Sequence, residues 1–453
     1  MNLKKIIIPL LLVVHNLSAF AQIIDDDYKK NQPKENSPFS RFGLGNVSPQ
    51  YLVGNGSMGG LRAAYRDPYS YNPQNPASLP SLKSAALEIG LSAKYNTIKD
   101  GSNTSSDWSG NISHVALGFP TYSVINEVLD RKPRQLRWGM GFSLMPYNTV
   151  GYNILTEGKA PNTDTVNVAN FYIGSGGTYR VMWGNGVSYK GFSAGVNLGY
   201  IFGRMNYIRQ TELSANVITP YANYFEDNYN LRGLTWNAGV QYDFTLDPQS
   251  NPLEKGNRKH IIIGLYGNPS TSFSTNSGSY YRRTIIGFNT DSISSSSEIK
   301  GKGKLPSEIT AGISYENGMA LKIGAEFSTS KWSQYQNDAR PETLKDISQF
   351  AIGAEFILNK NKLRNEEEKI RWRLGFRTGK DPRSLQNEQL SNQVFTAGMS
   401  LPLRVGRGSQ ISYLSLGLEM GKLGTAKLKE DYFKISAGFT LNDNTWFLKR
   451  KFQ

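Results

Sequence analysis

Residues 433–441 read Phe-Lys-Ile-Ser-Ala-Gly-Phe-Thr-Leu, with an apolar side chain at every second position. Residues 414–421, Leu-Ser-Leu-Gly-Leu-Glu-Met-Gly, repeat this alternation shortly before. Successive side chains of a β-strand point to opposite faces, so each segment has one apolar and one polar face. The end of the chain therefore predicts two strands that meet an apolar environment on one side only.

The same two-residue period begins near Leu87 and recurs along most of the chain. Counting weaker segments, we expect about fourteen strands in an all-β fold. The clearest further segments are 87–95, 138–144, 192–202, 234–244, 309–315, 321–327, 352–358, 372–376 and 395–403. Two architectures fit this pattern: a soluble β-sandwich with the apolar face inward, or a transmembrane antiparallel β-barrel with that face outward.

Polar stretches rich in Ser, Asn, Lys and Glu are expected to separate the strands, since they lack the apolar period. They are 97–107, 156–167, 211–230, 245–259, 289–304, 333–346, 359–369 and 380–391. In bacterial outer-membrane barrels short turns face the periplasm and longer loops face outside. A short link such as Asn317-Gly318 is typical of a tight turn.

Residues 1–21 have the pattern of a cleaved signal peptide. Lys4 and Lys5 precede an apolar run, and Ala19-Phe20-Ala21 forms an A-x-A cleavage site. The run is too short to cross a bilayer, which needs about 20 apolar residues. Export through a signal peptide, aromatic residues at strand ends and fourteen strands favour a β-barrel in the outer membrane of a Gram-negative bacterium.

We divide the exported chain into three parts. Residues 22–36 are polar and are expected to form a flexible periplasmic leader. Residues 37–82 are dense in Gly, Pro, Asn and Tyr and have no sustained period, which predicts an ordered segment packed inside or under the barrel. Residues 83–453 would form the transmembrane barrel. The mean hydropathy of −0.44 fits this division, because half of each barrel strand is polar.

The formal net charge of +15 comes from Lys and Arg residues dispersed over strands and loops. This dispersal argues against a nucleic-acid partner and favours a basic barrel rim that faces anionic lipid. Outer-membrane lipid and lipopolysaccharide are therefore expected partners.

The chain has few residues suited to catalysis. It contains no cysteine, and the exported part has two histidines, His114 and His260. A Ser/His hydrolase needs an oriented nucleophile and base, and the sequence alone pairs no serine with His114. We expect no enzymatic activity, no metal site and no cofactor, and interpret His114 as part of a hydrogen-bond network in the lumen.

Charged residues on the polar strand faces are expected to point into the lumen. Arg371, Arg373 and Arg377 lie on one strand face and could select anions. Mixed charges in a lumen more often pair with one another. The lumen-facing candidates are Glu88, Lys94, Lys322, Glu326, Glu355, Arg371, Arg373, Arg377, Glu419 and Lys434.

The order of three short motifs resembles the N-terminal region of the FadL-like outer-membrane barrels, the long-chain fatty acid transporter superfamily. The motifs are Gly56-Ser57-Met58-Gly59-Gly60, Asp67-Pro68 and Asn75-Pro76-Ala77-Ser78. The resemblance implies a fourteen-stranded barrel with an N-terminal hatch or plug in its lumen, while Asn-Pro-Ala-Ser is also compatible with a turn into the first strand. The implied hatch residues are Gly56, Met58, Gly59, Gly60, Asp67, Asn75, Pro76 and Ala77.

The resemblance implies two functions. The first is passage of hydrophobic small molecules, which leave through a lateral opening at a strand kink; Pro146 and Gly151 are the candidate kink residues. The alternative is a non-transporting subunit or partner barrel of an outer-membrane machine, for secretion such as type IX or for assembly of outer-membrane proteins. The first needs a hydrophobic ligand, and the second needs protein partners.

Overall fold

A computed structural model describes residues 35–101, 103–129, 134–159, 167–213, 221–246, 259–285, 290–358, 369–404 and 411–445. The signal peptide and residues 22–34 of the leader lie outside this range. None of the helices in the described ranges is both long and apolar enough to cross a bilayer.

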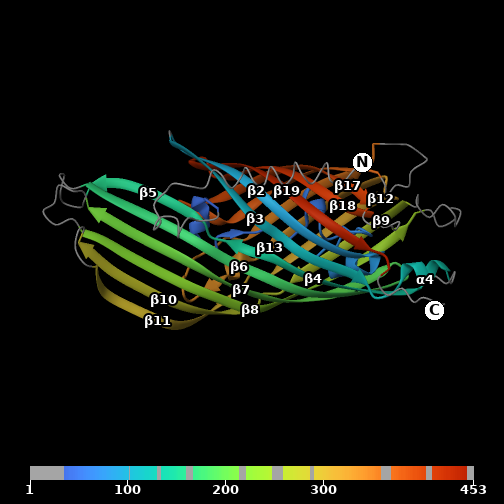
Figure 1. Ribbon diagram of the computed structural model, residues 1–453, viewed down its shortest axis with the longest axis horizontal. Coiled ribbons are helices and arrows are strands. Elements are labelled where there is room, and N and C mark those ends of the chain that lie inside the picture. The colour runs from blue at the N-terminus through green and yellow to red at the C-terminus, as the bar shows by residue number, and fades with distance from the viewer. Residues whose placement is uncertain are drawn as a thin grey trace.

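The strands join edge to edge in a closed, antiparallel barrel of fourteen strands, as predicted (Figure 1). The last strand pairs with the first wall strand, with Phe433 opposite Tyr95. The wall consists of β2 (Ala85–Asp100), β3 (Asn103–Pro120), β4 (Leu136–Thr149), β5 (Tyr152–Lys159), β6 (Asn167–Tyr189), β7 (Phe192–Leu213), β8 (Tyr221–Thr245), β9 (Lys259–Asn268), β10 (Ser272–Ile285), β11 (Thr290–Lys304), β12 (Glu308–Asn317), β13 (Leu321–Ser330), β14 (Gln336–Asn337), β15 (Ile347–Phe356), β16 (Arg371–Leu385), β17 (Glu388–Arg404), β18 (Ile411–Gly424) and β19 (Leu428–Asp443).

Four wall strands are interrupted, so that two consecutive segments follow one path. β6 pairs with β4 along one half and with β5 along the other. In the same way β8 pairs with both β10 and β9. The chain before and between these strands contains short elements: η2 (Pro38–Arg41), β1 (Asn46–Val47), α3 (Val53–Gly56), η3 (Pro76–Ser81), α4 (Val124–Leu129) and η5 (Trp332–Gln334).

The outer face of the wall carries the apolar residues of the alternation. On β8, for example, Leu234 is 74% exposed and Trp236 is 47% exposed. A soluble protein rarely exposes a large contiguous apolar surface, whereas a membrane barrel needs an apolar band about 25 Å tall. The alternation therefore points outward, which identifies a transmembrane barrel rather than a sandwich.

The structure corrects the prediction that several polar stretches are links between strands. Most of 211–230 continues β7 and β8, and most of 289–304 forms β11. Outside the hydrocarbon core the outer face needs no apolar residues, so the period disappears although the strands continue to pair. Sequence alternation therefore detected only the membrane-spanning half of these strands.

The barrel has two unlike ends. β2 begins and β19 ends together, with Ala85 opposite Asp443, at what we call the terminal end. At the opposite, distal end, strands β5, β6, β7, β8, β10 and β11 project far beyond the others (Figure 1). β8 has 25 residues whereas β15 has 10. Because long elements of such barrels face outside, we infer that the distal end is extracellular.

Candidate functional site

Residues 35–84, here called the lumen segment, lie inside the barrel and contact many wall strands. A tight turn at Gly59 and Gly60 lets the segment pass close to the wall. Gly59 and Gly60 have φ angles of 74° and 78°, a conformation that glycine adopts without strain. A Cβ on Gly59 would lie 2.7 Å from the carbonyl oxygen of Ile352 on β15. The paired wall glycines Gly353 and Gly375 make room on their side for the backbone of this turn.

A second contact region lies nearer the terminal end, at η3. The Asn75 side chain accepts a hydrogen bond from the Ala77 N–H (3.1 Å) and donates one to the Ala63 carbonyl (2.6 Å). Pro76 occupies the first turn of η3, where its missing N–H costs nothing. Pro76 packs on the glycine-lined wall of β6 and β7, since a Cβ on Gly195 would lie 2.8 Å from its Cβ.

Three predicted wall charges form ion pairs with the lumen segment. Arg371 on β16 donates to Asp67 at 2.7 Å, and both side chains are almost fully buried. Glu326 on β13 accepts from the backbone N–H groups of Arg62 and Ala63, each at 2.6 Å, and pairs with the Arg62 guanidinium at 3.2 Å. Fixed charges on the wall therefore hold the segment in place.

Nearer the distal end, Lys94 on β2 forms the third ion pair with the lumen segment. It pairs with Glu35 at 2.8 Å and with Glu430 at 3.1 Å. Asn36 also takes part, because its carbonyl accepts from the Asn96 side chain. Glu35 and Asn36, which the sequence analysis places at the end of the leader, thus have specific partners on the wall.

The remaining predicted charges pair along the wall. Arg373 binds Glu355 at 2.6 Å, and Arg377 binds Glu419 at 2.5 Å. Each of the three arginines considered for anion selection therefore faces a carboxylate. Two lysines complete the set: Lys434 lies 3.9 Å from Glu419, and Lys322 pairs with Glu316 at 3.0 Å. This arrangement favours the ion-pair interpretation over anion selection.

Arg66 of the lumen segment has two acceptors on the wall, and sequence reasoning did not single out one of them, Glu316. Arg66 pairs with Asp243 on β8 at 2.8 Å and with Glu316 on β12 at 3.5 Å. Arg66 lies next to the predicted hatch residue Asp67 in the sequence, and this was the available signal that Arg66 could bind the wall. Alternation assigns a residue to one face of a strand, but it does not reveal which distant residue pairs with it.

His114 lies in a hydrogen-bonded chain, as the sequence analysis anticipated. Its Nε2 is 3.1 Å from Glu88, and its Nδ1 is 3.1 Å from the Ser113 hydroxyl. Glu88 also accepts from Ser70 of the lumen segment and from Thr440 on β19. The histidine side chain is 0% exposed, so no substrate could reach its ring. The chain of contacts ties three wall strands, β2, β3 and β19, to the lumen segment.

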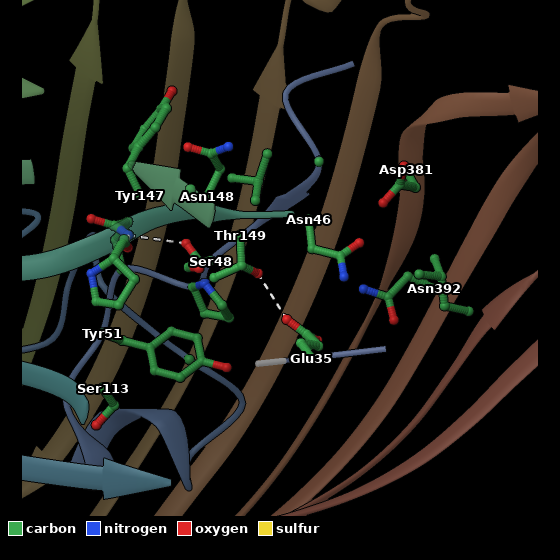
Figure 2. Close-up of a pocket in the computed structure, with 18 of the residues that line it drawn as sticks. Glu35, Asn46, Ser48, Tyr51, Ser113, Tyr147, Asn148, Thr149, Asp381 and Asn392 are labelled. Carbon is green, nitrogen blue, oxygen red and sulfur yellow. Dashed lines mark hydrogen bonds between the residues drawn. The ribbon is translucent and has the colours of Figure 1, made fainter. Parts of the chain in front are cut away.

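A cavity of about 740 Å³ lies on the distal side of the lumen segment. Figure 2 shows Glu35, Asn46 and Tyr51 of the segment around it, together with Thr149 and Asn392 of the wall. Charged side chains form much of its lining: Arg62, Lys94, Arg180, Glu326, Arg377, Arg383, Glu419 and Glu430. Charged groups and apolar side chains therefore share the lining.

The cavity reaches a gap in the barrel wall between β3 and β4. These strands pair only from Val115, opposite Leu144, to Pro120, opposite Gly139. Farther toward the distal end β1 of the lumen segment takes the place of β3, and its Val47 pairs with Asn148 of β4. Within the described chain, β3 from Asn103 to His114 pairs with β2 alone.

The two kink candidates from the sequence lie on the strand that borders this gap. The register of β4 shifts between Pro146 and Asn148, and the strand is interrupted at Val150 and Gly151 before β5 begins. Gln50 of the lumen segment donates to the Pro146 carbonyl at 2.6 Å, and the Ser48 N–H donates to the Tyr147 carbonyl at 2.9 Å. The segment thus fills the opening with backbone and polar side chains.

Solved structures share this architecture over nearly their whole length. They include the toluene transporter TodX of Pseudomonas putida (13% identity, 89% of this chain and 100% of that chain, TM-score 0.54) and the CymD monoaromatic hydrocarbon channel (14%, 88% and 98%, 0.51). A Pseudomonas aeruginosa FadL homologue matches with 11% identity over 87% of this chain and 99% of that chain, with a TM-score of 0.53. At such identities the likeness shows the fold.

The closed wall has the fold of these barrels, which include a FadL homologue, as the motifs implied. No curated protein matches the chain by sequence. The chain belongs to the BamG family, whose model matches residues 3–453.

Proposed function

We propose that this barrel is a closed, non-transporting partner subunit of an outer-membrane machine, serving secretion or the assembly of outer-membrane proteins. The observation that carries the proposal is the set of ion pairs between wall and lumen segment, of which Arg371–Asp67 is buried on both sides. Arg371–Asp67, Glu326–Arg62 and Lys94–Glu35 hold the segment at three places. Removing one partner of a buried pair costs about 3–5 kcal/mol, so displacing the whole segment would be expensive.

The charged side chains in the cavity lining support the same proposal. A route for apolar molecules needs an apolar lining, because each buried charge is costly next to a ligand that offers it no partner. The lining includes Arg180, whose guanidinium donates to Gln50 at 2.8 Å. Partner proteins would then be held by the outer wall or by the distal projection.

The test is a pull-down of the tagged protein at its native level in mild detergent, followed by mass spectrometry of proteins and lipids. We expect stoichiometric outer-membrane protein partners and no apolar ligand in the lumen. A lone barrel that carries bound fatty acid or another apolar ligand would contradict the proposal.

A second candidate is passage of hydrophobic small molecules, and the gap between β3 and β4 favours it. The gap opens beside the cavity and is filled by a segment that is not itself a wall strand. Solved barrels of the same fold include a toluene transporter and a monoaromatic hydrocarbon channel. On this hypothesis residues 46–50 would move aside to let a molecule leave toward the membrane.

Deletion of residues 37–82 separates the two candidates. The wall strands begin at Ala85, so we expect the barrel still to insert. Passage predicts faster uptake of toluene by the deletion variant and measurable uptake by the unaltered chain. The partner role predicts uptake only in the variant. If the deletion prevents insertion, the segment is needed to build the wall and is not a plug.

A further inference from the structure

The outer surface changes from apolar to basic at one level on neighbouring strands of the projecting wall. On β7 the outward residues Tyr200 and Phe202 are followed by Arg204. On β8 the outward Arg232 comes just before Leu234. Tyr200 and Phe202 stack with ring centroids 6.1 Å apart, as aromatic side chains do in the girdles of membrane barrels. This change marks the edge of the apolar band that faces the distal end.

Three lysines on β11 continue the same basic surface. Lys300, Lys302 and Lys304 alternate along the strand, and all three are exposed. The register places Arg232 opposite Ser274, and Ser274 opposite Lys302. With strands about 4.8 Å apart, the backbones of Arg232 and Lys302 are about 10 Å apart on the same face. Together with Arg204 and Arg232, these lysines form what we call the basic patch.

The basic patch carries five cations beside the carboxylate of Asp338, which accepts a hydrogen bond from the Lys302 backbone N–H at 2.9 Å. In the part of the chain that the structure describes, none of its five cations pairs with a carboxylate side chain. Arg204 donates two hydrogen bonds to the Asn228 side chain, which is neutral. The residues between the cations, Asn230, Ser274 and Asn276, are polar and uncharged.

Toward the distal end, the lysines on the opposite side of the barrel lie around a carboxylate, unlike those of the basic patch. There Lys99 pairs with Asp431 at 3.4 Å. Lys422 stands opposite that same aspartate, and Lys429 stands opposite Lys99. These three exposed lysines surround a carboxylate, so their local field is partly neutralised. On the projecting wall five cations lie near the Asp338 carboxylate, so most of their positive charge is uncompensated.

We propose that the basic patch binds the phosphate groups of lipid A in the outer leaflet. The patch stands directly above the apolar band, where headgroups lie, on strands that the barrel polarity places outside the cell. Guanidinium groups bind phosphate through parallel N–H donors, and lysines bind it as point charges. The apolar band extends from Phe202 and Leu234 toward the terminal end. This band would contact the acyl chains of the same lipid A molecule.

The test measures binding of purified lipid A to the detergent-solubilised exported chain by native mass spectrometry. The patch variant carries Lys300→Gln, Lys302→Gln and Lys304→Gln. The control variant carries Lys99→Gln, Lys422→Gln and Lys429→Gln, which removes the same net charge. A single Lys302→Gln variant gives a milder change, and heat-modifiable gel mobility verifies that each barrel is folded.

We expect the patch variant to bind phosphorylated lipid A at least tenfold more weakly, because each cation near an anionic surface contributes roughly fivefold in affinity. The control variant should bind within twofold of the unaltered chain, and lipid A without phosphate should bind all three proteins equally weakly. Equal losses in both variants would show a net-charge effect and overturn the proposal. Unchanged binding by the patch variant, or binding that ignores phosphate, would overturn it as well.

Discussion

At the scale of single residues, the lumen shows what a buried charge requires. Asp67 and Arg371 are 2% and 3% exposed and meet at 2.7 Å, although 304 positions separate them in the chain. Leaving either charge alone in the lumen would be costly, whereas replacing both with apolar groups is often tolerated. The pair therefore specifies where the lumen segment sits.

Asp67→Ala should lower the free energy of unfolding by about 3–5 kcal/mol, because the Arg371 guanidinium loses its carboxylate inside the barrel. Urea unfolding in detergent measures this. The matched control is Asp431→Ala, which removes an exposed pair with Lys99 and should cost less than about 1 kcal/mol.

A double variant tests the interpretation further. Combining Asp67→Leu with Arg371→Met removes both charges while keeping side-chain volume, and it should restore most of the stability lost in Asp67→Ala. If Asp67→Ala and Asp431→Ala cost the same, the lumen pair does not anchor the segment.

At the scale of elements, the fit between segment and wall depends on glycines of two paired strands. Gly353 on β15 stands opposite Gly375 on β16, and the turn at Met58 and Gly59 fills the space beside them. A methyl group on Gly375 would overlap the Gly59 backbone, which cannot yield as a flexible side chain does.

Gly375→Ala should therefore push the lumen segment out of place while the wall remains closed, at a cost of about 1–3 kcal/mol. Limited proteolysis of the folded barrel should show faster cleavage within residues 52–61. Gly110→Ala on β3 is the control, since its Cβ would meet only the Ser92 carbonyl oxygen at 3.9 Å. Equal protection of both variants would mean that the wall adjusts around the added methyl group.

The elements also show how far the sequence alone could lead. Alternation identified the strands wherever their outer face meets hydrocarbon, as along 192–202 and 234–244, and their number followed from it. It missed β11 and the distal half of β8, because strands outside the membrane have no apolar face to mark them. It assigned Arg373 and Glu419 to the lumen but not to partners, since pairing depends on register between distant strands.

At the scale of the whole molecule, the inferred orientation in the membrane has a direct test. The chain has no cysteine, so a single introduced cysteine gives an unambiguous label. Ala426→Cys is exposed in the distal link between β18 and β19, and Lys259→Cys is exposed at the terminal end of β9.

A membrane-impermeant maleimide should label Ala426→Cys in intact cells and Lys259→Cys only after lysis. The reverse pattern would place the projecting wall in the periplasm and remove the basis for the lipid A site. Labelling of both after lysis serves as the positive control.

The distance in sequence between the lumen segment and its anchors has a consequence for the order of biogenesis. The segment leaves the export machinery first, yet Arg371 and Glu419, which bind Asp67 and Tyr51 of the segment, arrive with the last third of the chain. The same late part supplies β19, whose pairing with β2 closes the cylinder. The residues that fix the lumen segment and the strand that completes the wall therefore become available together, at the end of export.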